Sequence, residues 1–274
     1  MPAMITVKGV VLRETAYGEH DKLFDLFTEN GIYTVRARGV RKQGSKYAAV
    51  TQVFSYGEFC LRQSGERYFL DSAVPVNLFF GLRGDLEALA LAAYFAELLR
   101  NTATQQPQPQ ILRLFLHCLH YLCEHTRPPL QIKAIFELRL ATELGHAPNL
   151  LCCNLCGEFL PKQLYFRVPS GDFVCKDCRI SDAEGGIAAS AAVLQAARHI
   201  VFSDFERVFL FRLGEHALET LQIYTERNLL TALNLHMPRT LLFYRTLTDA
   251  EPPSAPQNAE DILRNRYHPN PNGT

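Results

Sequence analysis

The chain has 274 residues, 47% of them hydrophobic, and its 28 lysines and arginines are balanced by 28 aspartates and glutamates. This is the composition of a globular protein with a substantial core, and the length suits two domains better than one. The balanced charge excludes a global attraction to nucleic acids or membranes, so any polyanion binding must be local. No segment approaches the roughly 18 uninterrupted apolar residues of a membrane-spanning helix, which predicts a soluble protein without a membrane partner.

From residue 4 to about 74 the sequence has the pattern of short strands, rich in β-branched and aromatic residues and separated by turn-forming segments. The predicted strands are Met4–Arg13, Lys22–Thr28, Ile32–Val40, Thr51–Gln63 and Arg67–Val74. Asn30-Gly31 and Ser64-Gly65 suit tight hairpin turns. Five such strands predict a closed OB-fold β-barrel over residues 1–80.

After Pro75 the apolar periodicity becomes helical. Candidate helices cover residues 85–100, 108–126, 129–144, 189–202, 214–232 and 238–248. Asp85 can cap the first helix, and Pro129 and Gly145 mark the ends of the third. Residues 81–248 are therefore predicted to form an α-helical domain, which makes the whole an α+β multidomain protein. Residues 249–274 have the composition of a disordered linker and tail.

Four cysteines form two Cys-x-x-Cys pairs within the helical region, at about residues 150–180. The pairs are Cys153 with Cys156 and Cys175 with Cys178, and 18 residues separate them. This spacing is typical of a tetrahedral zinc site, in which four thiolates fill the metal's coordination shell. A filled shell leaves no position for water or substrate, so we predict one structural Zn²⁺ and no metal catalysis. Cys152 could serve as a metal ligand in place of Cys153, which would lengthen the spacing of the first pair by one residue.

Disulfides are the alternative use of these cysteines. The N-terminus has no apolar signal segment, which predicts a cytoplasmic, nucleoid-associated protein in a reducing compartment, where paired Cys-x-x-Cys turns more often hold a metal. The remaining cysteines, Cys60, Cys118 and Cys123, are most simply buried small hydrophobic residues. We therefore place zinc ahead of disulfides.

A local excess of positive charge occupies the third predicted strand and the loop that follows it. No acidic residue occurs between Glu29 and Glu58. The cations in that interval are Arg36, Arg38, Arg41, Lys42 and Lys46. Strand alternation places the two arginines at 36 and 38 on one face, opposite Val35 and Ala37.

Aromatic residues lie near these cations in the sequence, at Tyr47, Phe54 and Tyr56. Cations that follow the phosphates, interleaved with rings that stack on bases, are how OB-fold modules bind single strands. The alternative is a solvated strand end beside core aromatics. On a five-stranded barrel we favour DNA binding by the basic residues 36–46.

Other patterns in the sequence do not indicate a catalytic or metal-binding site. The segment from Gly39 to Lys46 has phosphate-loop glycine spacing, but its residue order is wrong and no apolar helix follows, which excludes nucleotide hydrolysis. His117, His120 and Glu124 fall opposite the apolar stripe of their predicted helix, so a solvated face is expected rather than a metal site. The alternative is that this face of the helix binds an acidic peptide. No Gly-x-Ser-x-Gly or His-Glu-x-x-His motif occurs, so no enzyme is predicted.

Several segments together resemble the RecO family of bacterial recombination mediators. They are Val-Lys-Gly-Val-Val-Leu-Arg at 7–13, Gly-Glu-His-Asp-Lys-Leu at 18–23, Leu-Phe-Thr-Glu-x-Gly at 26–31, Ala-Arg-Gly-Val-Arg-Lys at 37–42 and Pro-Arg-Thr-Leu-Leu-Phe-Tyr at 238–244. The order of helices and cysteine pairs is also similar, and the resemblance covers roughly residues 4–248. Some RecO-like proteins lack the cysteines.

The resemblance implies an N-terminal OB-fold that binds DNA, a helical domain with an embedded zinc module and a non-enzymatic role in repair. Such proteins bind single- and double-stranded DNA and anneal complementary strands. They contact the acidic C-terminal tail of single-strand-binding protein, and with RecR they help to load RecA. For the tail, basic candidates on the helical surface are Arg113, Arg127, Lys133 and Arg139.

Two other functions fit the residues. One is an RNA-binding OB-fold protein with a zinc-ribbon appendage, which would read 2′-hydroxyl groups and prefer ribonucleotides. The other is a scaffold whose basic loop binds an acidic partner and no nucleic acid.

Overall fold

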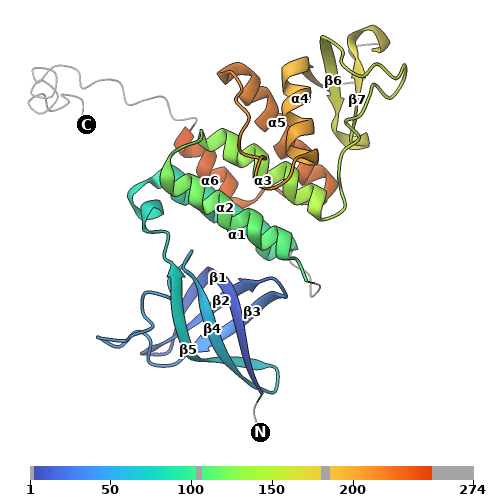
Figure 1. Ribbon diagram of the computed structural model, residues 1–274. Coiled ribbons are helices and arrows are strands. Elements are labelled where there is room, and N and C mark those ends of the chain that lie inside the picture. The colour runs from blue at the N-terminus through green and yellow to red at the C-terminus, as the bar shows by residue number, and fades with distance from the viewer. Residues whose placement is uncertain (1–2, 103–106, 180–185, 249–274) are drawn as a thin grey trace, which may run out of the picture.

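The computed structural model describes residues 3–102, 107–179 and 186–248. The predicted disordered tail, residues 249–274, lies outside this range. A small β-barrel at one end packs beneath a layer of helices, and a second small sheet lies at the far end of the helical domain (Figure 1). Among the described residues, no helix is long and apolar enough to cross a membrane.

The barrel is closed and its strands are hydrogen-bonded in the order β1-β2-β3-β5-β4. The strands are β1 Met4–Tyr17, β2 Asp21–Thr28, β3 Gly31–Ala37, β4 Tyr56–Ser64 and β5 Arg67–Asn77. All pairs are antiparallel except β3 with β5, which run parallel and close the barrel. At Gly9 a Cβ atom would lie 2.6 Å from the Phe27 carbonyl oxygen, so only glycine permits this close approach of β1 to β2. The predicted five-stranded OB-type barrel is confirmed.

Four predicted strand limits differ from the structure by three residues or more. β1 extends to Tyr17 rather than Arg13, and β5 extends to Asn77 rather than Val74. The third strand ends at Ala37 because the chain turns at Gly39, whose φ of +64° is a conformation that favours glycine. The fourth begins at Tyr56 rather than Thr51, since residues 45–55 form consecutive turns. Phe54, with a φ of 67°, ends these turns, and its backbone N–H donates 2.7 Å to the Val11 carbonyl of β1.

Two clusters of buried side chains organise the molecule. One fills the barrel and consists of Val11, Phe24, Leu26, Val35, Ala37, Val40, Val50, Phe59 and Leu61. The other is the core of the helical domain, and it continues into the barrel's upper end through Val10, Leu12, Phe27 and Phe54. The barrel and the helices therefore share an apolar interface rather than a flexible joint.

The six predicted helices are all present, with ends within two residues of those expected. They are α1 Leu86–Thr102, α2 Pro109–Glu124, α3 Pro129–Glu143, α4 Ala191–Phe202, α5 Glu215–Ala232 and α6 Arg239–Thr248. The 3₁₀ turn η1 (Phe80–Gly84) links the barrel to α1. Helix α1 is buried on most of its surface, as its apolar sequence predicts, and it packs against α2, α3 and α6.

The segment between α3 and α4 contains structure that the sequence pattern did not predict. Strands β6 (Gln163–Arg167), β7 (Asp172–Cys175) and β8 (Ile187–Ser190) form an antiparallel sheet in the order β7-β6-β8. The 3₁₀ turns η2 (Val168–Ser170) and η3 (Lys176–Cys178) flank β7. The second cysteine pair thus begins at the end of a strand rather than in an unstructured loop.

Candidate nucleic-acid interface and four-cysteine cluster

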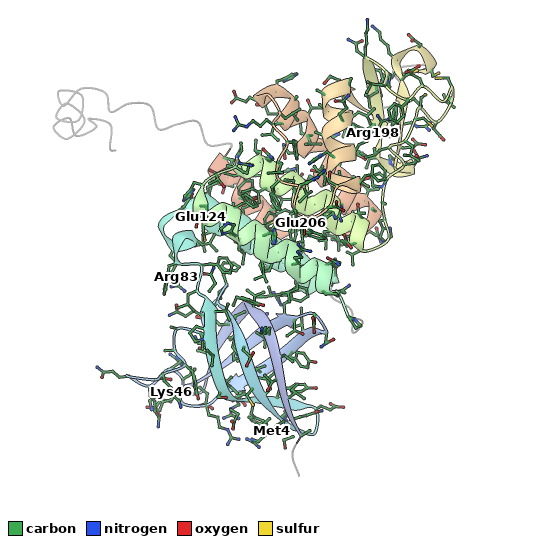
Figure 2. All side chains as sticks on the ribbon, viewed as in Figure 1. Met4, Lys46, Arg83, Glu124, Arg198 and Glu206 are labelled. Atoms are coloured by element: carbon green, nitrogen blue, oxygen red, sulfur yellow. The ribbon has the colours of Figure 1, made fainter. Side chains whose placement is uncertain are left out.

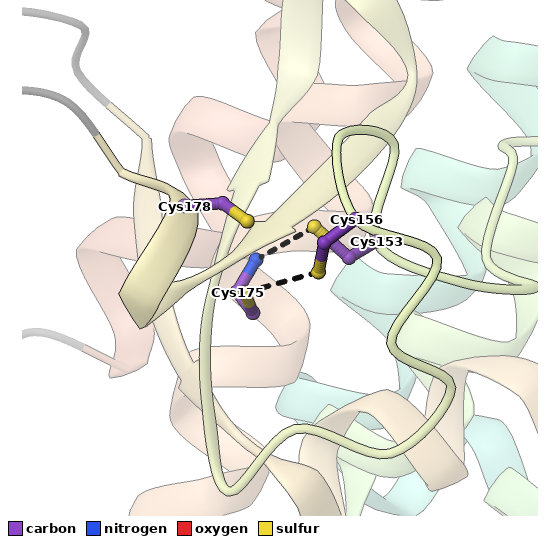
Figure 3. A group of neighbouring side chains, drawn as sticks. All are labelled: Cys153, Cys156, Cys175 and Cys178. Atoms are coloured by element: carbon purple, nitrogen blue, oxygen red, sulfur yellow. Dashed lines mark hydrogen bonds between the residues drawn. The ribbon is translucent and has the colours of Figure 1, made fainter.

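The four cysteines of the two Cys-x-x-Cys pairs converge in space (Figure 3). Their sulfur atoms all lie within 4.8 Å of one another, and the Sγ atoms of Cys156 and Cys175 are 3.7 Å apart. A tetrahedral ion with metal–sulfur bonds of about 2.3 Å holds its sulfurs about 3.8 Å apart. Cys153, not Cys152, belongs to the cluster. The donor set and its spacing fit a tetrahedral metal ion.

Backbone N–H groups surround the sulfur of Cys153. The N–H of Cys175 donates to this sulfur at 3.3 Å, and Gly157, at a φ of 77°, closes the first turn by donating to the Cys153 carbonyl at 3.0 Å. Burial alone would raise the pKa of Cys153, but backbone hydrogen bonds from Cys156, Cys175 and Leu155 lower the pKa to about 6. The turn therefore favours a thiolate, which is the form that binds a metal.

The surroundings of the cluster indicate a structural role. Cys153 and Cys175 are buried in the helical domain's core. Arg198 of α4 holds the preceding chain by donating to the carbonyl oxygens of Leu150 (2.6 Å), Leu151 (2.7 Å) and Phe159 (2.5 Å). A metal at this position would tie the β6-β7-β8 sheet to the first cysteine turn and leave no position for a substrate.

A second group of side chains lies on the outer face of the barrel, where β5 is flanked by β3 and β4. The ring of Phe69 faces outward from β5, and its neighbours in the ladder are Arg36 of β3 and Arg62 of β4. The guanidinium groups of Arg38 and Arg62 lie 4.9 and 5.0 Å from the centroid of this ring. Because β3 and β4 border β5 on opposite sides, the two arginines approach Phe69 from opposite directions.

No ion pair joins Arg38 or Arg62 to a carboxylate in the part of the chain that the structure describes. Stacking fixes their side chains without pairing either guanidinium with a carboxylate. The charge of Arg38 still acts on Asp21, whose pKa is lowered first by the Gly39 N–H, then by Arg36 and last by Arg38. We call Arg38, Phe69 and Arg62 the barrel clamp. The barrel clamp can offer two guanidinium groups to phosphates or bases at little further cost in side-chain entropy.

Arg36 is held differently. Its guanidinium donates twice to one carboxylate oxygen of Asp21, at 2.8 and 2.7 Å, and stacks 4.6 Å from the ring centroid of Tyr17. The other oxygen of Asp21 accepts the Gly39 N–H at 2.8 Å. The pKa of Asp21 is lowered first by this backbone hydrogen bond and then by Arg36. Asp21 thereby neutralises Arg36 and anchors the start of the basic loop.

The three remaining predicted cations lie on the loop after β3, which projects from the barrel at Lys46 (Figure 2). Arg41 donates to the carbonyl oxygens of Gly18 and Glu19 at 3.3 and 3.4 Å. Lys42 is exposed, and the amine of Lys46 lies 4.8 Å from the ring centroid of Tyr47. The five predicted cations thus share one side of the barrel, four of them with exposed side chains and Arg36 paired.

The aromatic part of the prediction needs correction. Phe54 is only 5% exposed and packs on Phe115 in the interface with the helices, so it cannot stack on a base. Tyr47 and Tyr56 are partly buried. The aromatic residue that meets the arginines is Phe69, which sequence reasoning missed together with Arg62. The signal was available, since Arg62 and Phe69 both alternate with core residues on their strands.

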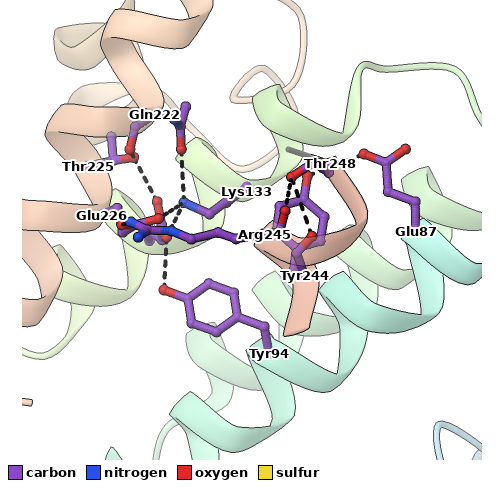
Figure 4. A network of polar contacts seen from close by, with 10 residues as sticks. Glu87, Tyr94, Lys133, Gln222, Thr225, Glu226, Tyr244, Arg245 and Thr248 are labelled. Atoms are coloured by element: carbon purple, nitrogen blue, oxygen red, sulfur yellow. Dashed lines mark hydrogen bonds and ion pairs between the residues drawn. The ribbon is translucent and has the colours of Figure 1, made fainter. Parts of the chain in front are cut away.

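The basic candidates on the helical domain are used for internal contacts. Lys133 is 1% exposed, and its amine binds the carboxylates of Glu137 and Glu226 at 2.8 and 2.7 Å and the Gln222 side chain at 3.2 Å (Figure 4). The prediction that Lys133 lies on the helical surface is therefore wrong. Burial raises the pKa of Glu137, although Lys133 opposes this.

The three arginines among those candidates also have partners. Arg139 donates to the carbonyl oxygens of Ile200, Val201 and Ser203 at 3.1, 2.9 and 3.1 Å, and so caps the end of α4. Arg127 donates 2.6 Å to the Phe209 carbonyl, and Arg113 donates 2.6 Å to Glu206. Of these three arginines, Arg113 is the one most accessible to an external ligand, because its side chain is 44% exposed.

The histidine face of α2 is only partly solvated. His120 and Glu124 are exposed as expected, but His117 packs 6.2 Å from Phe209 and 6.4 Å from Phe205, ring centroid to ring centroid. Burial, and then Arg113, lower the pKa of His117. These residues do not form a metal-binding group among the described residues.

The closed five-stranded barrel, with its cationic outer face and a helical domain that carries four converging thiols, defines an OB-fold protein whose helical domain has a cysteine cluster that could hold a metal ion. Residues 1–79 match the family model "Recombination protein O N terminal", and residues 83–239 match "Recombination protein O C terminal". The chain therefore belongs to the RecO family.

Relatives named "DNA repair protein RecO" occur in many bacteria. The one from Acetivibrio thermocellus is 31% identical over 245 residues, which cover 89% of this chain and 97% of the relative. That from Dehalococcoides mccartyi is 27% identical over 252 residues, covering 91% and 98%. That from Bacillus subtilis strain 168 is 34% identical over 173 residues, covering 62% and 67%.

Proposed function

We propose that this chain is a non-enzymatic DNA repair and recombination mediator. It binds single- and double-stranded DNA, anneals complementary strands and, with RecR, helps to load RecA onto DNA coated by single-strand-binding protein. Membership of the RecO family and the names of its relatives support the repair role. The proposal of DNA binding depends mainly on one observation, the barrel clamp. In it, Arg38 and Arg62 stack on Phe69 and form no ion pair among the described residues.

The barrel clamp suits binding that ignores sequence. Because Arg38 and Arg62 both stack on the Phe69 ring, we expect bases to meet the two guanidinium groups rather than the ring itself. Arg41, Lys42 and Lys46 on the projecting loop add charge for phosphates along the strand. Arg36 contributes less, since Asp21 already neutralises it.

Annealing follows from the same electrostatics. Two strands repel each other through their phosphates, and a protein that neutralises phosphates without reading base edges lowers this repulsion while leaving the bases free to pair. An exposed cationic face on a rigid barrel meets this requirement. It also predicts binding that weakens steeply with added salt.

The partner proteins follow from family membership. Contact with RecR, with the acidic tail of single-strand-binding protein, and indirectly with RecA is proposed on that ground alone. Lys133 is unsuited to the tail because it is buried and doubly paired. Among the four basic candidates, Arg113 is the best placed for an acidic peptide, since its side chain is 44% exposed.

For the four-cysteine cluster we propose one structural Zn²⁺ held by Cys153, Cys156, Cys175 and Cys178. Sulfur separations near those of a tetrahedral site support this assignment. Zinc would cross-link the small sheet to the first cysteine turn and supply no reaction chemistry. Metal analysis of the purified protein tests it, and about one zinc per chain is expected.

The decisive experiment measures annealing of two complementary fluorescent strands by the wild type and by the double variant Arg38→Glu, Arg62→Glu. We expect the variant to lose most of the annealing and of the single-strand binding at low salt. Arg227→Glu, an exposed arginine on α5, is the control for an added negative charge. Unchanged activity in the double variant contradicts the proposal, and a preference for ribo-oligonucleotides favours an RNA-binding protein instead.

A further inference from the structure

A large groove lies between the barrel and the helical domain. Its volume is about 1020 Å³, at the upper end of what whole small ligands occupy. Its walls come from β1, the turns before β4, η1, α1 and the start of α6. The apolar part of the lining consists of Leu12, Val53, Phe54, Phe79, Leu82, Leu89, Ala93 and Ala96.

Both acidic residues that line the groove are already paired. The Glu97 carboxylate accepts the backbone N–H groups of Arg239 and Thr240 at 3.4 and 3.0 Å and the Thr240 hydroxyl at 2.5 Å. Glu14 pairs with Lys22 at 2.6 Å. These contacts fix the start of α6 and one end of β1, and they leave no acidic side chain free to bind a cation in the groove.

Three arginines at the rim, by contrast, have no carboxylate partner among the described residues. They are Arg13 of β1, Arg83 of η1 and Arg239 of α6, and all three are exposed. Arg83 lies on the segment between the barrel and α1 (Figure 2), where it stacks 4.7 Å from the Phe80 ring centroid. The groove therefore has an apolar wall and a rim with three uncompensated positive charges from separate elements.

We propose that this groove binds a segment of single-stranded nucleic acid, with phosphates at Arg13, Arg83 and Arg239 and bases against Val53, Leu89 and Ala93, the partly exposed residues of the apolar wall. This inference rests on the proposed function and extends it with a second binding site. Rim charges supplied by three separate elements match the repeated charge of a polynucleotide backbone. A duplex fits less well, because its bases are stacked inside and would leave the apolar wall without a partner.

The groove is also continuous with the barrel's cationic side. Arg13 and Tyr17 lie on the same face of β1, since they are four residues apart on one strand. Tyr17 in turn stacks on Arg36, which neighbours Phe69 in the sheet. A strand that leaves the barrel clamp along β1 therefore meets Arg13 at the groove. Binding across both domains would hold the strand extended for annealing.

Binding of a labelled oligodeoxythymidine to the full chain tests the proposal. We expect the triple variant Arg13→Glu, Arg83→Glu, Arg239→Glu to lose affinity at least about tenfold, and the slope of log K against log salt to fall by about two, at about 0.7 per phosphate contact. The matched control is Arg207→Glu, Arg212→Glu, Arg227→Glu, which places the same charge change on exposed arginines elsewhere. Thermal unfolding verifies that both triple variants are folded.

Photo-cross-linking locates the strand independently of any arginine. Gln52 lines the groove and is partly exposed, so a Gln52→benzoylphenylalanine variant should cross-link to the labelled strand and much less to a duplex of the same length. Equal cross-linking of strand and duplex, or none to the strand, overturns the proposal.

The outcomes separate this inference from the proposed function. If the groove variant behaves as its control while Arg38→Glu, Arg62→Glu abolishes binding, the groove proposal fails and the barrel function stands. If the wild type binds no single strand at low salt, both fail. If the groove variant keeps strand binding but loses binding to a polyglutamate peptide, the groove is a peptide site and the proposal is overturned.

Discussion

The barrel and the helical domain use their basic residues in opposite ways. On the barrel, Arg38 and Arg62 stack on Phe69 and form no ion pair with a carboxylate among the described residues. In the helical domain, Arg139 and Arg198 donate to several backbone carbonyls, and Lys133 is buried between two carboxylates. Charge in the sequence is thus a poor guide to a binding surface, because what matters is whether each charge already has a partner.

Physical reasoning explains the division. A buried cation must be paired, since an unpaired charge away from water costs several kcal/mol. A cation that binds a partner reversibly must instead remain solvated until the partner arrives. The helical domain therefore uses Lys133, Arg139 and Arg198 for stability, and the barrel keeps Arg38 and Arg62 available. Four experiments test this comparison between the two domains.

The largest effect is expected from removing the proposed metal. Cys156→Ser, or chelation of the wild type, should unfold the region around β6, β7 and β8 and sharply lower the melting temperature, because structural zinc contributes apparent energies of about 10–16 kcal/mol. Cys152→Ser is the matched control, as its thiol lies outside the cluster. Circular dichroism and calorimetry measure the outcome, and a melting temperature unaffected by chelation would contradict the zinc assignment.

A smaller but still large loss is expected from Lys133→Met. This variant leaves Glu137 buried without its cation, while Glu226 keeps Arg245, and the loss should cost about 3–5 kcal/mol of unfolding free energy. Lys162→Met, at an exposed lysine, should change stability by less than about 0.5 kcal/mol. Urea titration measures both. Equal stability of the two variants would show that the buried cluster is dispensable.

The comparison can also be tested within the barrel itself. Arg62→Ala should weaken single-strand binding by about 1 kcal/mol, roughly fivefold, whereas Arg36→Ala should weaken it less than about twofold because Asp21 already holds that guanidinium. Fluorescence anisotropy at fixed salt gives both affinities. A larger loss for Arg36→Ala would reverse the assignment of free and paired arginines.

The smallest effect concerns pH. Asp21 has a lowered pKa in the folded barrel, so its contribution to stability is fully present above its unfolded value of about 3.8 and is lost as pH falls through the folded pKa. The difference in unfolding free energy between the wild type and Asp21→Asn should therefore be constant above about pH 5 and shrink below it. Urea titrations at several pH values measure this difference, and one that persists at the acid end would exclude the carboxylate as its source.

The elements of the fold were largely predictable because they depend on local periodicity. All six helices and all five barrel strands were expected, and the errors lie at strand limits. Turn geometry ends β3 before Val40 and delays the start of β4 beyond Thr51, whereas β1 and β5 continue past Arg13 and Val74. Strands β6, β7 and β8 were missed because they have only 4–5 residues, too few for a periodic signal. They form where the two cysteine turns come together.

By itself, the sequence determined the barrel, the helices, the four cysteines that converge in one cluster and the side of the barrel that carries positive charge. These follow from alternation, spacing and composition, which are properties of neighbouring residues. Only the tertiary structure decided which cations are free. Asp21 and Arg36 are 15 positions apart in the sequence, and Glu226 and Lys133 are 93 positions apart. Arg38 and Arg62 instead stack on Phe69, and neither forms an ion pair among the described residues. Pairing over such separations depends on how the elements pack, which no local pattern records.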